Sequence, residues 1–379
     1  MKNLYVLAAG GTGGHLFPAE SLAQELKARG YTVVLFTDER VDKWVRKECF
    51  DRVVVSTFRE KAKMKQHPSI WSLFKYVGVD CTKDIKKVTF VTRLVACGIK
   101  SLLMFLWQRP RAVVGFGGYP SAPTVLAAQL LGIRSVLHEC NAIIGRANKV
   151  LARNASAITT GFRQVVNLND KIKHKQIFIG NPVRGAIADL ANVPPISLED
   201  ELCILVVGGS QGARLFANVV PDAVLQLPKD IRMRVTMQVG EDDIQRIDRL
   251  FKQHGVDAEL APFFYDMSDK LAHSHVVISR GGATSLAEFA ASGIPSILVP
   301  LESSRDGDQL YNAMRFEANG AAVLMRESTF SASSLCGVLS EMYANRNVLR
   351  EMSNAAREMY APDAGKRLAD AVTQRPRNA

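Results

Sequence analysis

Cysteine is scarce in this chain of 379 residues, and its six cysteines never form a C-x-x-C pair. This spacing excludes the common zinc and redox motifs, and scattered thiols are typical of a reduced, cytosolic protein. Long hydrophobic runs are scarce too. The run at 4–9 leads straight into glycines, which favours a buried strand over a signal peptide. The run at 94–107 is interrupted by Lys100 and is shorter than the roughly 20 residues that span a bilayer, so we expect no transmembrane helix.

The composition is that of an ordinary globular protein, with 47% hydrophobic and 22% charged residues. A chain of this length favours two domains over one or three. Its net charge of +11 is unevenly distributed, because residues 59–111 hold 12 Lys and Arg against 3 Asp and Glu. Such a basic segment attracts polyanions, which can be nucleic acid, an acidic membrane or a phosphorylated ligand.

Short apolar runs alternate with helix-length stretches along the whole chain. The runs that predict buried strands lie at 4–8, 32–36, 112–114, 135–138, 157–159, 203–207, 234–238, 275–279 and 296–299. Two series of strands alternating with helices predict an α/β fold of two Rossmann-like, parallel-sheet domains. Turn-rich stretches at 180–184 and 194–195 favour a boundary there. We place the domains at 1–183 and 184–357, and expect a C-terminal helix at about 358–379 to pack back on the first domain.

Four glycine-rich turns each follow a predicted strand, namely GGTGGH at 10–15, GFGGY at 115–119, GGSQGA at 208–213 and GGATS at 281–285. Glycine lets a ligand approach the backbone amides closely, and the helix that follows offers unpaired N–H groups and a positive dipole end. One such turn is often purely structural. Four of them at the carboxyl ends of strands, where ligands of open α/β sheets bind, indicate an anion site suited to a pyrophosphate.

A dinucleotide oxidoreductase is the obvious alternative, because Asp38 follows the second predicted strand as the acid of that fingerprint does. The glycine spacing argues against it. Gly13 is followed three residues later by Leu16, where the G-x-G-x-x-G pattern needs glycine or alanine, and the turn at 208–213 fails the pattern as well. The sequence therefore disfavours hydride transfer.

Polar residues around the turns are the candidate functional groups. His15 suits a general base that removes a hydroxyl proton, and the structural alternative is a histidine that caps or packs a helix end. SLAE at 285–288 fits a capping box, whereas the functional interpretation has Glu288 accept ribose hydroxyls; both stay open. HECN at 138–141 can bind a sugar or satisfy a turn. Arg184 can reach a phosphate, and the pair at 308–309 can bind a sugar or begin a helix.

The basic segment has two parts. Six hydrophobic residues recur at helical spacing and predict one buried stripe, with the lysines as the solvated face: Ile85, Val88, Val95, Ile99, Leu102 and Leu106. The stretch 61–77 instead places lysines beside Ile70, Trp71, Leu73 and Phe74, a pattern that docks on an anionic bilayer. No nucleic-acid recognition motif accompanies the charge, so we expect no nucleic-acid partner.

Several motifs occur in the order found in glycosyltransferase family 28, and the match spans nearly the whole chain. They are GGTGGH at 10–15, GFGGYPS at 115–121, HE-x-N at 138–141, GNPVR at 180–184, GGSQGAR at 208–214 and RGGATS-x-x-E at 280–288. The chain resembles the members of this family that add N-acetylglucosamine to the lipid-linked precursor of bacterial cell wall. GNPVR together with GGSQGAR is the specific part of the match.

The resemblance implies a GT-B fold, with two domains facing across a deep cleft. It implies inverting transfer of N-acetylglucosamine from UDP-GlcNAc to the 4-hydroxyl of MurNAc in undecaprenyl-pyrophosphoryl-MurNAc-pentapeptide (lipid I), with His15 as the base. The donor-site residues are Thr12, Gly13, Gly14, Asn141, Arg184, Ser210, Gln211, Phe264, Ala283, Thr284, Ser285, Glu288, Asp308 and Gln309. The residues on the acceptor and membrane side are Tyr119, Glu139, Lys61, Lys63, Lys65, Trp71 and Phe74.

Within this set, Arg184, Ser210 and Gln211 would serve the phosphates. The uracil would lie near Phe264, Ala283 and Thr284. Glu288 would hold the ribose, and the pair at 308–309 the GlcNAc. Thr12 and Asn141 would also line the acceptor side.

The resemblance implies no cofactor and no metal. The implied partners are UDP-GlcNAc, lipid I, an anionic membrane surface and other cell-wall synthesis proteins, at the cytoplasmic face of the bacterial inner membrane. The chain departs from the family at Cys140 and Asp308, where glutamine is frequent, and in a longer segment at 58–110. Two alternatives are a related transferase that glycosylates diacylglycerol and an inactive membrane scaffold that binds a nucleotide sugar.

Overall fold

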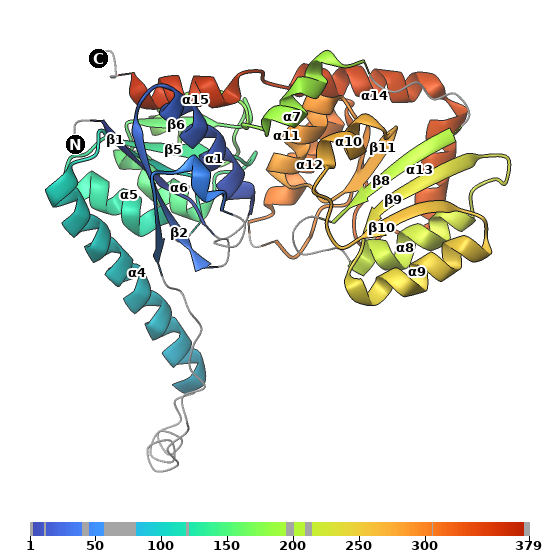
Figure 1. The fold of residues 1–379 in the computed structure, drawn as a ribbon, viewed down its shortest axis with the longest axis horizontal. Coiled ribbons are helices and arrows are strands. Elements are labelled where there is room, and N and C mark those ends of the chain that lie inside the picture. The colour runs from blue at the N-terminus through green and yellow to red at the C-terminus, as the bar shows by residue number, and fades with distance from the viewer. Residues whose placement is uncertain are drawn as a thin grey trace, which may run out of the picture.

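The computed structural model describes residues 3–10, 13–39, 45–56, 81–118, 121–194, 201–208, 214–304 and 306–374. Two parallel β-sheets, each flanked by helices, occupy separate halves of the molecule (Figure 1). The chain passes from the first sheet to the second between residues 179 and 200. The predicted α/β class with two parallel-sheet domains is thereby confirmed.

The first sheet has seven strands in the order β3-β2-β1-β4-β5-β6-β7. The strands are β1 (Leu4–Ala8), β2 (Thr32–Asp38), β3 (Arg52–Ser56), β4 (Ala112–Gly115), β5 (Ser135–Glu139), β6 (Ala157–Thr160) and β7 (Gln176–Phe178). Its helices are α1 (Gly13–Ala28), α4 (Cys81–Gln108), α5 (Ser121–Leu130) and α6 (Arg146–Leu151), with short 3-10 helices η1 (Lys47–Cys49), η2 (Ala152–Asn154) and η3 (Asp170–Lys175).

Strand β1 shows why this sheet is covered on both faces. All five of its side chains are buried, and successive side chains of a strand point to opposite faces. Tyr5 and Leu7 therefore join the core beneath α1, whereas Leu4 and Val6 join the core that Phe105 of α4 and residues of α5 complete.

The second sheet has six strands in the order β10-β9-β8-β11-β12-β13. The strands are β8 (Glu201–Val207), β9 (Arg232–Gln238), β10 (Asp257–Ala261), β11 (Val276–Ser279), β12 (Ser296–Leu298) and β13 (Ala322–Leu324). The helices from the junction onward are α7 (Gly185–Ala188), η4 (Asp189–Asn192), α8 (Arg214–Leu225), α9 (Glu241–Gln253), α10 (Met267–Ala272), α11 (Ala283–Ser292), α12 (Asp308–Ala318), α13 (Ala332–Ala344), α14 (Arg346–Met359) and α15 (Ala364–Thr373).

Both sheets reverse their strand order at the same place, between the first strand and the fourth. In the first sheet this point lies between β1 and β4, which end level with each other because Ala8 pairs with Gly115. In the second sheet it lies between β8 and β11, where Val207 pairs with Ser279. Open α/β sheets bind ligands in the crevice at this reversal. All four glycine-rich turns begin at these strand ends.

The C-terminal helix α15 leaves the second half of the molecule and packs against α1 of the first. Arg29, directly after α1, and Asp370 of α15 form an ion pair with Nη1 and Oδ1 2.6 Å apart. Gly365 lies so close to α1 that a Cβ there would come within 2.7 Å of the Ser21 hydroxyl. Figure 1 shows α14 and α15 running along one side of both halves.

The prediction of a buried apolar stripe on α4 is wrong for the residues whose side chains the structure describes. Val95, Ile99 and Leu106 are more than half exposed, at 54%, 53% and 53%, and Leu102 is only partly buried. The buried face instead contains Cys97, Ser101 and Phe105. This face packs against α5, where the Ser101 hydroxyl lies 3.2 Å from that of Thr124. The side chains of Ile85 and Val88 lie outside the described residues.

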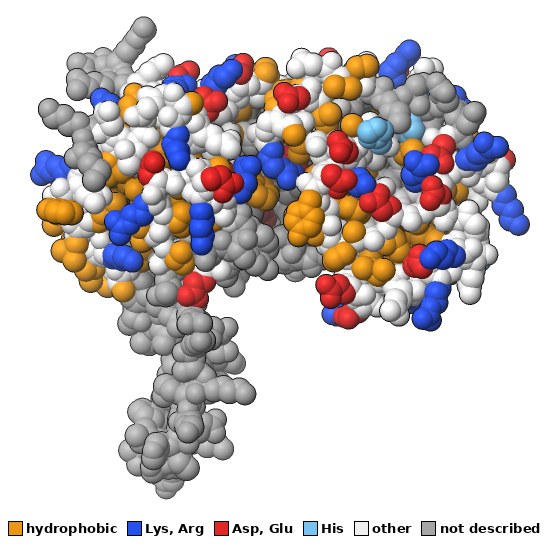
Figure 2. Space-filling model, viewed as in Figure 1, with side chains coloured by type: hydrophobic (Ala, Val, Ile, Leu, Met, Phe, Trp, Pro, Cys, Tyr) orange, Lys and Arg blue, Asp and Glu red, His pale blue; other side chains and the backbone are white. Residues whose placement is uncertain are grey.

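Large exposed apolar side chains lie on α4 and on its neighbour α5. Leu103 and Trp107 of α4 are 62% and 87% exposed, and Leu126 and Leu130 of α5 are 47% and 72% exposed. Figure 2 shows hydrophobic side chains gathered over this end of the first half, with lysine and arginine side chains beside them. Across the ranges that the structure describes, no helix is both long and apolar enough to cross a membrane.

Candidate active site

His15 lies in the first turn of α1 and is partly buried beneath the glycine turn that follows β4. Gly117 provides the space for its ring, since a Cβ there would lie 3.3 Å from His15 Cε1. Gly117 also has a φ of +87°, which other residues rarely adopt. Two glycine turns therefore meet around this imidazole, as expected for strand ends at one reversal point.

Burial lowers the pKa of His15, although the Asp308 carboxylate and the Phe116 carbonyl both act to raise it. The imidazole is therefore neutral near physiological pH, the state in which a histidine can accept a proton. Its Nδ1 is buried and has no hydrogen-bond partner among the residues that the structure describes. Asp308 is the first residue of α12 in the second sheet's domain, so the group that would stabilise a protonated His15 comes from across the domain junction.

Glu139 lies at the end of β5 and is almost fully buried. Its carboxylate accepts hydrogen bonds from the backbone N–H groups of Asn141 and Gly145, at 3.1 and 2.9 Å, and from the side-chain amides of Asn141 and Asn148, at 3.2 and 2.9 Å. Burial raises the pKa of Glu139, and these four donors act to lower it. Glu139 thus fixes the loop from β5 to α6, and Asn141 with it.

Asn312 joins the two domains and was not identified from the sequence. It is fully buried in α12, where its Nδ2 donates to Asn141 Oδ1 and to the Gly281 carbonyl, both at 3.0 Å. Its Oδ1 accepts from the backbone N–H of Ala142 at 2.7 Å. Asparagine is a poor helix former. Its occurrence inside a helix, one turn after Asp308, was the sequence feature that could have indicated a hydrogen-bonding role outside the helix.

Arg184 and Glu288 form an ion pair at the domain junction. Arg184 Nε and Nη2 lie 3.0 and 2.8 Å from the same atom, Glu288 Oε1. Burial raises the pKa of Glu288, whereas the Arg184 guanidinium lowers it. Arg184 also lies over the ring of Phe17 on α1, 5.5 Å from its centroid, so it contacts both domains.

The capping-box interpretation of the residues at 285–288 is wrong. Helix α11 begins at Ala283 after the N-cap Gly282, which makes no side-chain cap. Ser285 therefore lies inside the first turn, and the Glu288 carboxylate is directed to Arg184 instead of the helix end. The alternative in which Glu288 serves a ligand is the one that its position allows.

Gln309 and the glycine at 281 bring α12 against the turn before α11. A Cβ at Gly281 would lie 2.3 Å from the Gln309 carbonyl, so only glycine permits this approach. The Gln309 side chain accepts a hydrogen bond from the backbone N–H of Leu301 at 2.9 Å through Oε1. Its amide nitrogen is then oriented as a donor.

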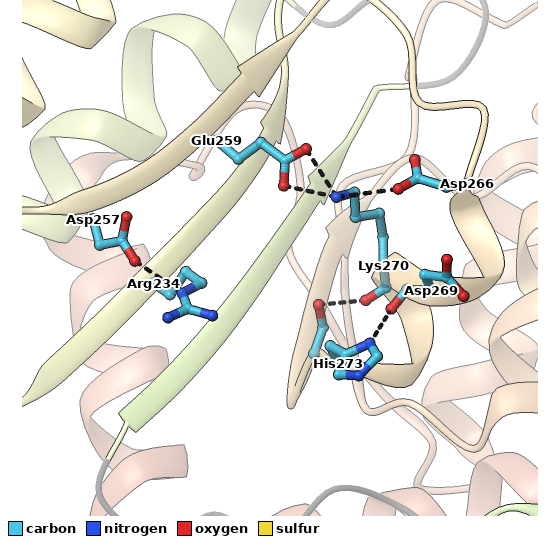
Figure 3. Close-up of polar contacts among 8 residues, drawn as sticks. Arg234, Asp257, Glu259, Asp266, Asp269, Lys270 and His273 are labelled. Carbon is cyan, nitrogen blue, oxygen red and sulfur yellow. Dashed lines mark hydrogen bonds and ion pairs between the residues drawn. The ribbon is translucent and has the colours of Figure 1, made fainter.

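Phe264 is buried in the second sheet's domain, next to a charged cluster around Lys270. Figure 3 shows Lys270 between the carboxylates of Glu259 and Asp266. Lys270 lies 2.8 and 2.7 Å from the two carboxylate oxygens of Glu259, and 3.3 Å from Asp266. The same ammonium lies 5.6 Å from the centre of the Phe264 ring. Lys270 therefore ties β10 and the loop that follows it to α10, and no sequence pattern predicted this residue.

Several predicted site residues lie outside the described residues: Thr12, Lys61, Lys63, Lys65, Trp71, Phe74, Tyr119, Ser210 and Gln211. Gly13 and Gly14 begin α1 next to His15, and Ala283, Thr284 and Ser285 form the first turn of α11. Within the described ranges, no three His, Cys, Asp or Glu side chains gather as they would around a metal ion.

Comparison with known proteins gives two matching families. The glycosyltransferase family 28 N-terminal domain matches residues 5–160, and the glycosyltransferase family 28 C-terminal domain matches residues 203–368. Together they cover most of the chain and both of its sheets.

Curated relatives match over nearly their whole length. The chain is 40% identical to the UDP-N-acetylglucosamine–N-acetylmuramyl-(pentapeptide) pyrophosphoryl-undecaprenol N-acetylglucosamine transferase of Methylobacterium radiotolerans, over 97% of this chain and 96% of the relative. It is 39% identical to the protein of that name from Rhizobium meliloti, over 97% and 94%.

Among solved structures, Acinetobacter baumannii MurG superposes with a TM-score of 0.76 and 25% identity, over 98% of this chain and 99% of that one. The calicheamicin glycosyltransferase CalG4 matches at 15% identity with a TM-score of 0.66, which shows a shared fold alone. The GT-B fold implied by the sequence motifs is confirmed.

Proposed function

The chain belongs to glycosyltransferase family 28, and we propose that it transfers N-acetylglucosamine from UDP-GlcNAc to the 4-hydroxyl of MurNAc in lipid I, with inversion. Relatives at about 40% identity over nearly the full chain bear the name of this activity. The observation that carries the proposal is the position of the His15 ring, which lies against the Gly117 turn at the strand reversal of one domain, with the Asp308 carboxylate of the other domain near enough to raise its pKa.

In this proposal His15 accepts the proton of the acceptor hydroxyl as its oxygen attacks the anomeric carbon of GlcNAc. The bond from that carbon to the diphosphate breaks at the same time, and UDP leaves with the electron pair. The imidazolium that forms is stabilised by Asp308, whose negative charge already acts on the ring. A base of this kind typically contributes 10²–10⁴-fold to the rate.

The donor lies against the second domain. Glu288 uses only Oε1 for Arg184, so we assign Oε2 to the ribose hydroxyls and the guanidinium to the diphosphate. Ser210 and Gln211, which precede α8 in the sequence, also serve the phosphates. Phe264, Ala283, Thr284 and Ser285 surround the uracil, and Gln309 donates its free amide to the sugar.

We propose residues 1–183 with the C-terminal helix as the acceptor domain, and residues 184–357 as the donor domain. Thr12, Gly13, Gly14, Tyr119 and Asn141 line the acceptor side, since the two glycine turns and the Glu139-bound loop meet there. The fixed loop holds Asn141 toward the second domain, where Asn312 binds it.

The acceptor's lipid requires contact with a membrane, and we assign this contact to the exposed apolar face of α4. Leu103 and Trp107 are the most exposed side chains on that face, and Lys100 is exposed among them. Apolar side chains flanked by lysine and arginine are suited to an anionic bilayer surface. The basic residues Lys61, Lys63 and Lys65, with Trp71 and Phe74, extend this surface in sequence. It would place the protein at the cytoplasmic membrane face, beside other cell-wall synthesis proteins.

The transfer is tested by incubating the protein with UDP-GlcNAc and a lipid I analogue, and detecting the product by mass. We expect a mass gain of one GlcNAc, and a rate reduced at least about 100-fold in His15→Ala. His254→Ala is the matched control, since His254 is exposed at the end of α9. Transfer to diacylglycerol instead would favour the related transferase, and no transfer to either would favour the inactive scaffold.

Membrane contact is tested separately by sedimentation with vesicles of mixed neutral and anionic phospholipid. Leu103→Glu and Trp107→Glu should each reduce binding severalfold, because a charge replaces an apolar group that enters the bilayer. Ile177 is an exposed residue of the edge strand β7 and does not belong to the α4 face, so Ile177→Glu should leave vesicle binding unchanged. Equal binding by all three variants would contradict the assignment to α4.

A further inference from the structure

A cavity of about 390 Å³ lies where three parts of the chain meet. One wall comes from the segments after β6 and β7, with Phe162 and Phe178, and the second from α11 and α12, with Phe316. The third is the segment that crosses back to the first domain, with Tyr360. None of the residues to which we assign the base, the diphosphate or the sugar lines it.

Three arginines line this cavity without a carboxylate partner within the part of the chain that the structure describes. They are Arg163, Arg315 and Arg367, each from a different wall. The one acidic residue among the lining residues is Glu358, so the lining carries an excess of two positive charges. Arg315 is partly buried, and Arg163 and Arg367 are exposed, so all three guanidinium groups can be reached by a ligand from solvent.

The rest of the lining is largely apolar and aromatic. Phe162 and Phe316 are buried, and the guanidinium of Arg163 lies 4.4 Å from the centre of the Phe178 ring. This stacking restrains a planar group whose N–H donors fit the oxygens of a phosphate. A pocket of 300–1,000 Å³ with apolar walls and a few convergent polar groups is the usual form of a small-molecule site.

We propose that this cavity binds a small organic phosphate, with its apolar body against Phe162, Phe178 and Phe316 and its phosphate held by Arg163, Arg315 and Arg367. A phosphate monoester carries a charge of about −1.5 to −2 at neutral pH, which matches the excess of two positive charges. Guanidinium groups bind phosphate through paired hydrogen bonds, and such charge-assisted bonds are the stronger kind.

Hydrogen-bonded asparagines separate this site from the candidate active site. Asn181 lines the cavity, and its Nδ2 donates to the Cys140 carbonyl at 2.9 Å and to the Ala283 carbonyl at 3.4 Å. Along α12, Asn312 lies between Asp308, on the active-site side, and Arg315, which lines the cavity. Asp308 and Arg315 are about 10 Å apart along the helix axis, at 1.5 Å per residue. The three arginines therefore lie apart from the base, the diphosphate and the sugar, and only Ala283 is shared with the donor site, at its uracil end. An occupant of the cavity would contact both domains.

The test is isothermal titration calorimetry of the full chain with phenyl phosphate, which combines an aromatic ring with a phosphate dianion. We expect one saturable site, with affinity reduced at least about tenfold in Arg163→Ala and in Arg315→Ala, as one lost charged hydrogen bond implies. Inorganic phosphate should bind at least about tenfold more weakly than phenyl phosphate, because it lacks the ring.

Two matched variants separate this site from other arginines. Arg249→Ala removes an exposed arginine of α9, and Arg184→Ala removes the one assigned to the donor; both should keep the affinity for phenyl phosphate within twofold. No saturable binding, an affinity insensitive to Arg163 and Arg315, or a loss of affinity in Arg184→Ala would each overturn the proposal. The readout needs no sugar transfer, so it can succeed where the proposed activity fails, and the reverse.

Discussion

Replacing Asn312 by alanine tests whether one buried amide holds the two domains in register. The side chain makes three hydrogen bonds, and the two with Asn141 and Ala142, at 3.0 and 2.7 Å, cross the junction. The third, from Nδ2 to the Gly281 carbonyl at 3.0 Å, stays within the second domain. Asn312→Ala removes all three. It leaves the Ala142 N–H and the Gly281 carbonyl buried beside a methyl group that can pair with neither.

The magnitude follows from these bonds. A hydrogen bond contributes about 1 kcal/mol net, and a buried group left without a partner costs about 1–3 kcal/mol. Three lost bonds therefore predict a decrease of roughly 3–5 kcal/mol in the free energy of unfolding. Because Asp308 lies one helical turn before Asn312, we also expect kcat for transfer to fall about tenfold, with a smaller change in the KM for UDP-GlcNAc.

Urea unfolding measures the first effect and single-turnover transfer the second. Asn312→Asp is the informative partner variant, since it retains the acceptor for the Ala142 N–H and loses only the donations. Relative to Asn312→Ala it should recover part of the stability at acidic pH, where the buried carboxyl is neutral, and lose it as the pH rises and a buried charge faces two oxygen acceptors. Asn354→Ala, an exposed asparagine on α14, should change stability by less than about 0.5 kcal/mol. A loss below about 1 kcal/mol in Asn312→Ala would refute the reasoning.

Three further predictions concern single side chains. Burial lowers the pKa of His138 to about 4 from 6.5, so between these values the unfolded chain binds a proton that the folded chain does not. The free energy of unfolding should therefore fall by roughly 3 kcal/mol as the pH decreases through this window, and His138→Gln should flatten the dependence. Glu288→Ala should raise the KM for UDP-GlcNAc about tenfold or more at similar kcat, as loss of a charged hydrogen bond predicts. Lys270→Ala should raise the same KM about fivefold, because the loop with Phe264 loses ion pairs worth roughly 1 kcal/mol.

Each of these has a control on the exposed surface. His254→Gln should leave the pH dependence of unfolding unchanged, and a His138→Gln curve that overlays the parent's would contradict the pKa argument. For transfer kinetics, Lys252→Ala removes a comparable ion pair with Asp248 and should leave KM unchanged. If Glu288→Ala or Lys270→Ala matched this control, the donor assignment would fail at that residue.

Periodicity in the sequence predicted the central strands and missed the outer ones. The four strands without a prediction are β3, β7, β10 and β13, and all four are sheet edges. Burial explains the difference. Strands covered on both faces are continuous apolar runs, whereas β7 and β10 have no fully buried side chain and so lack that signal.

Helix α4 shows a second limit. The helical spacing of its apolar residues was visible, but the face that packs carries Ser101 and Cys97, whose small size lets α5 approach. Spacing alone could not show that the larger apolar residues lie outward. Similarly, the glycine turns directed attention to His15 and Glu288, and GNPVR to Arg184, whereas Asn312 depends on contacts between residues some 170 positions apart.

The ion pair between Arg184 and Glu288 suggests how donor binding is organised. Each residue is assigned to a different part of UDP-GlcNAc, yet in the structure each satisfies the other. A partly buried charge that loses its partner is costly, so neither residue can turn to a ligand alone without loss. A diphosphate that drew Arg184 away would leave Glu288 unpaired unless ribose hydroxyls donated to it. Binding of the diphosphate and binding of the ribose are therefore coupled. This coupling favours the intact nucleotide over pyrophosphate or uridine. The selectivity for the intact nucleotide arises between α7 and α11, at the domain junction that transfer requires.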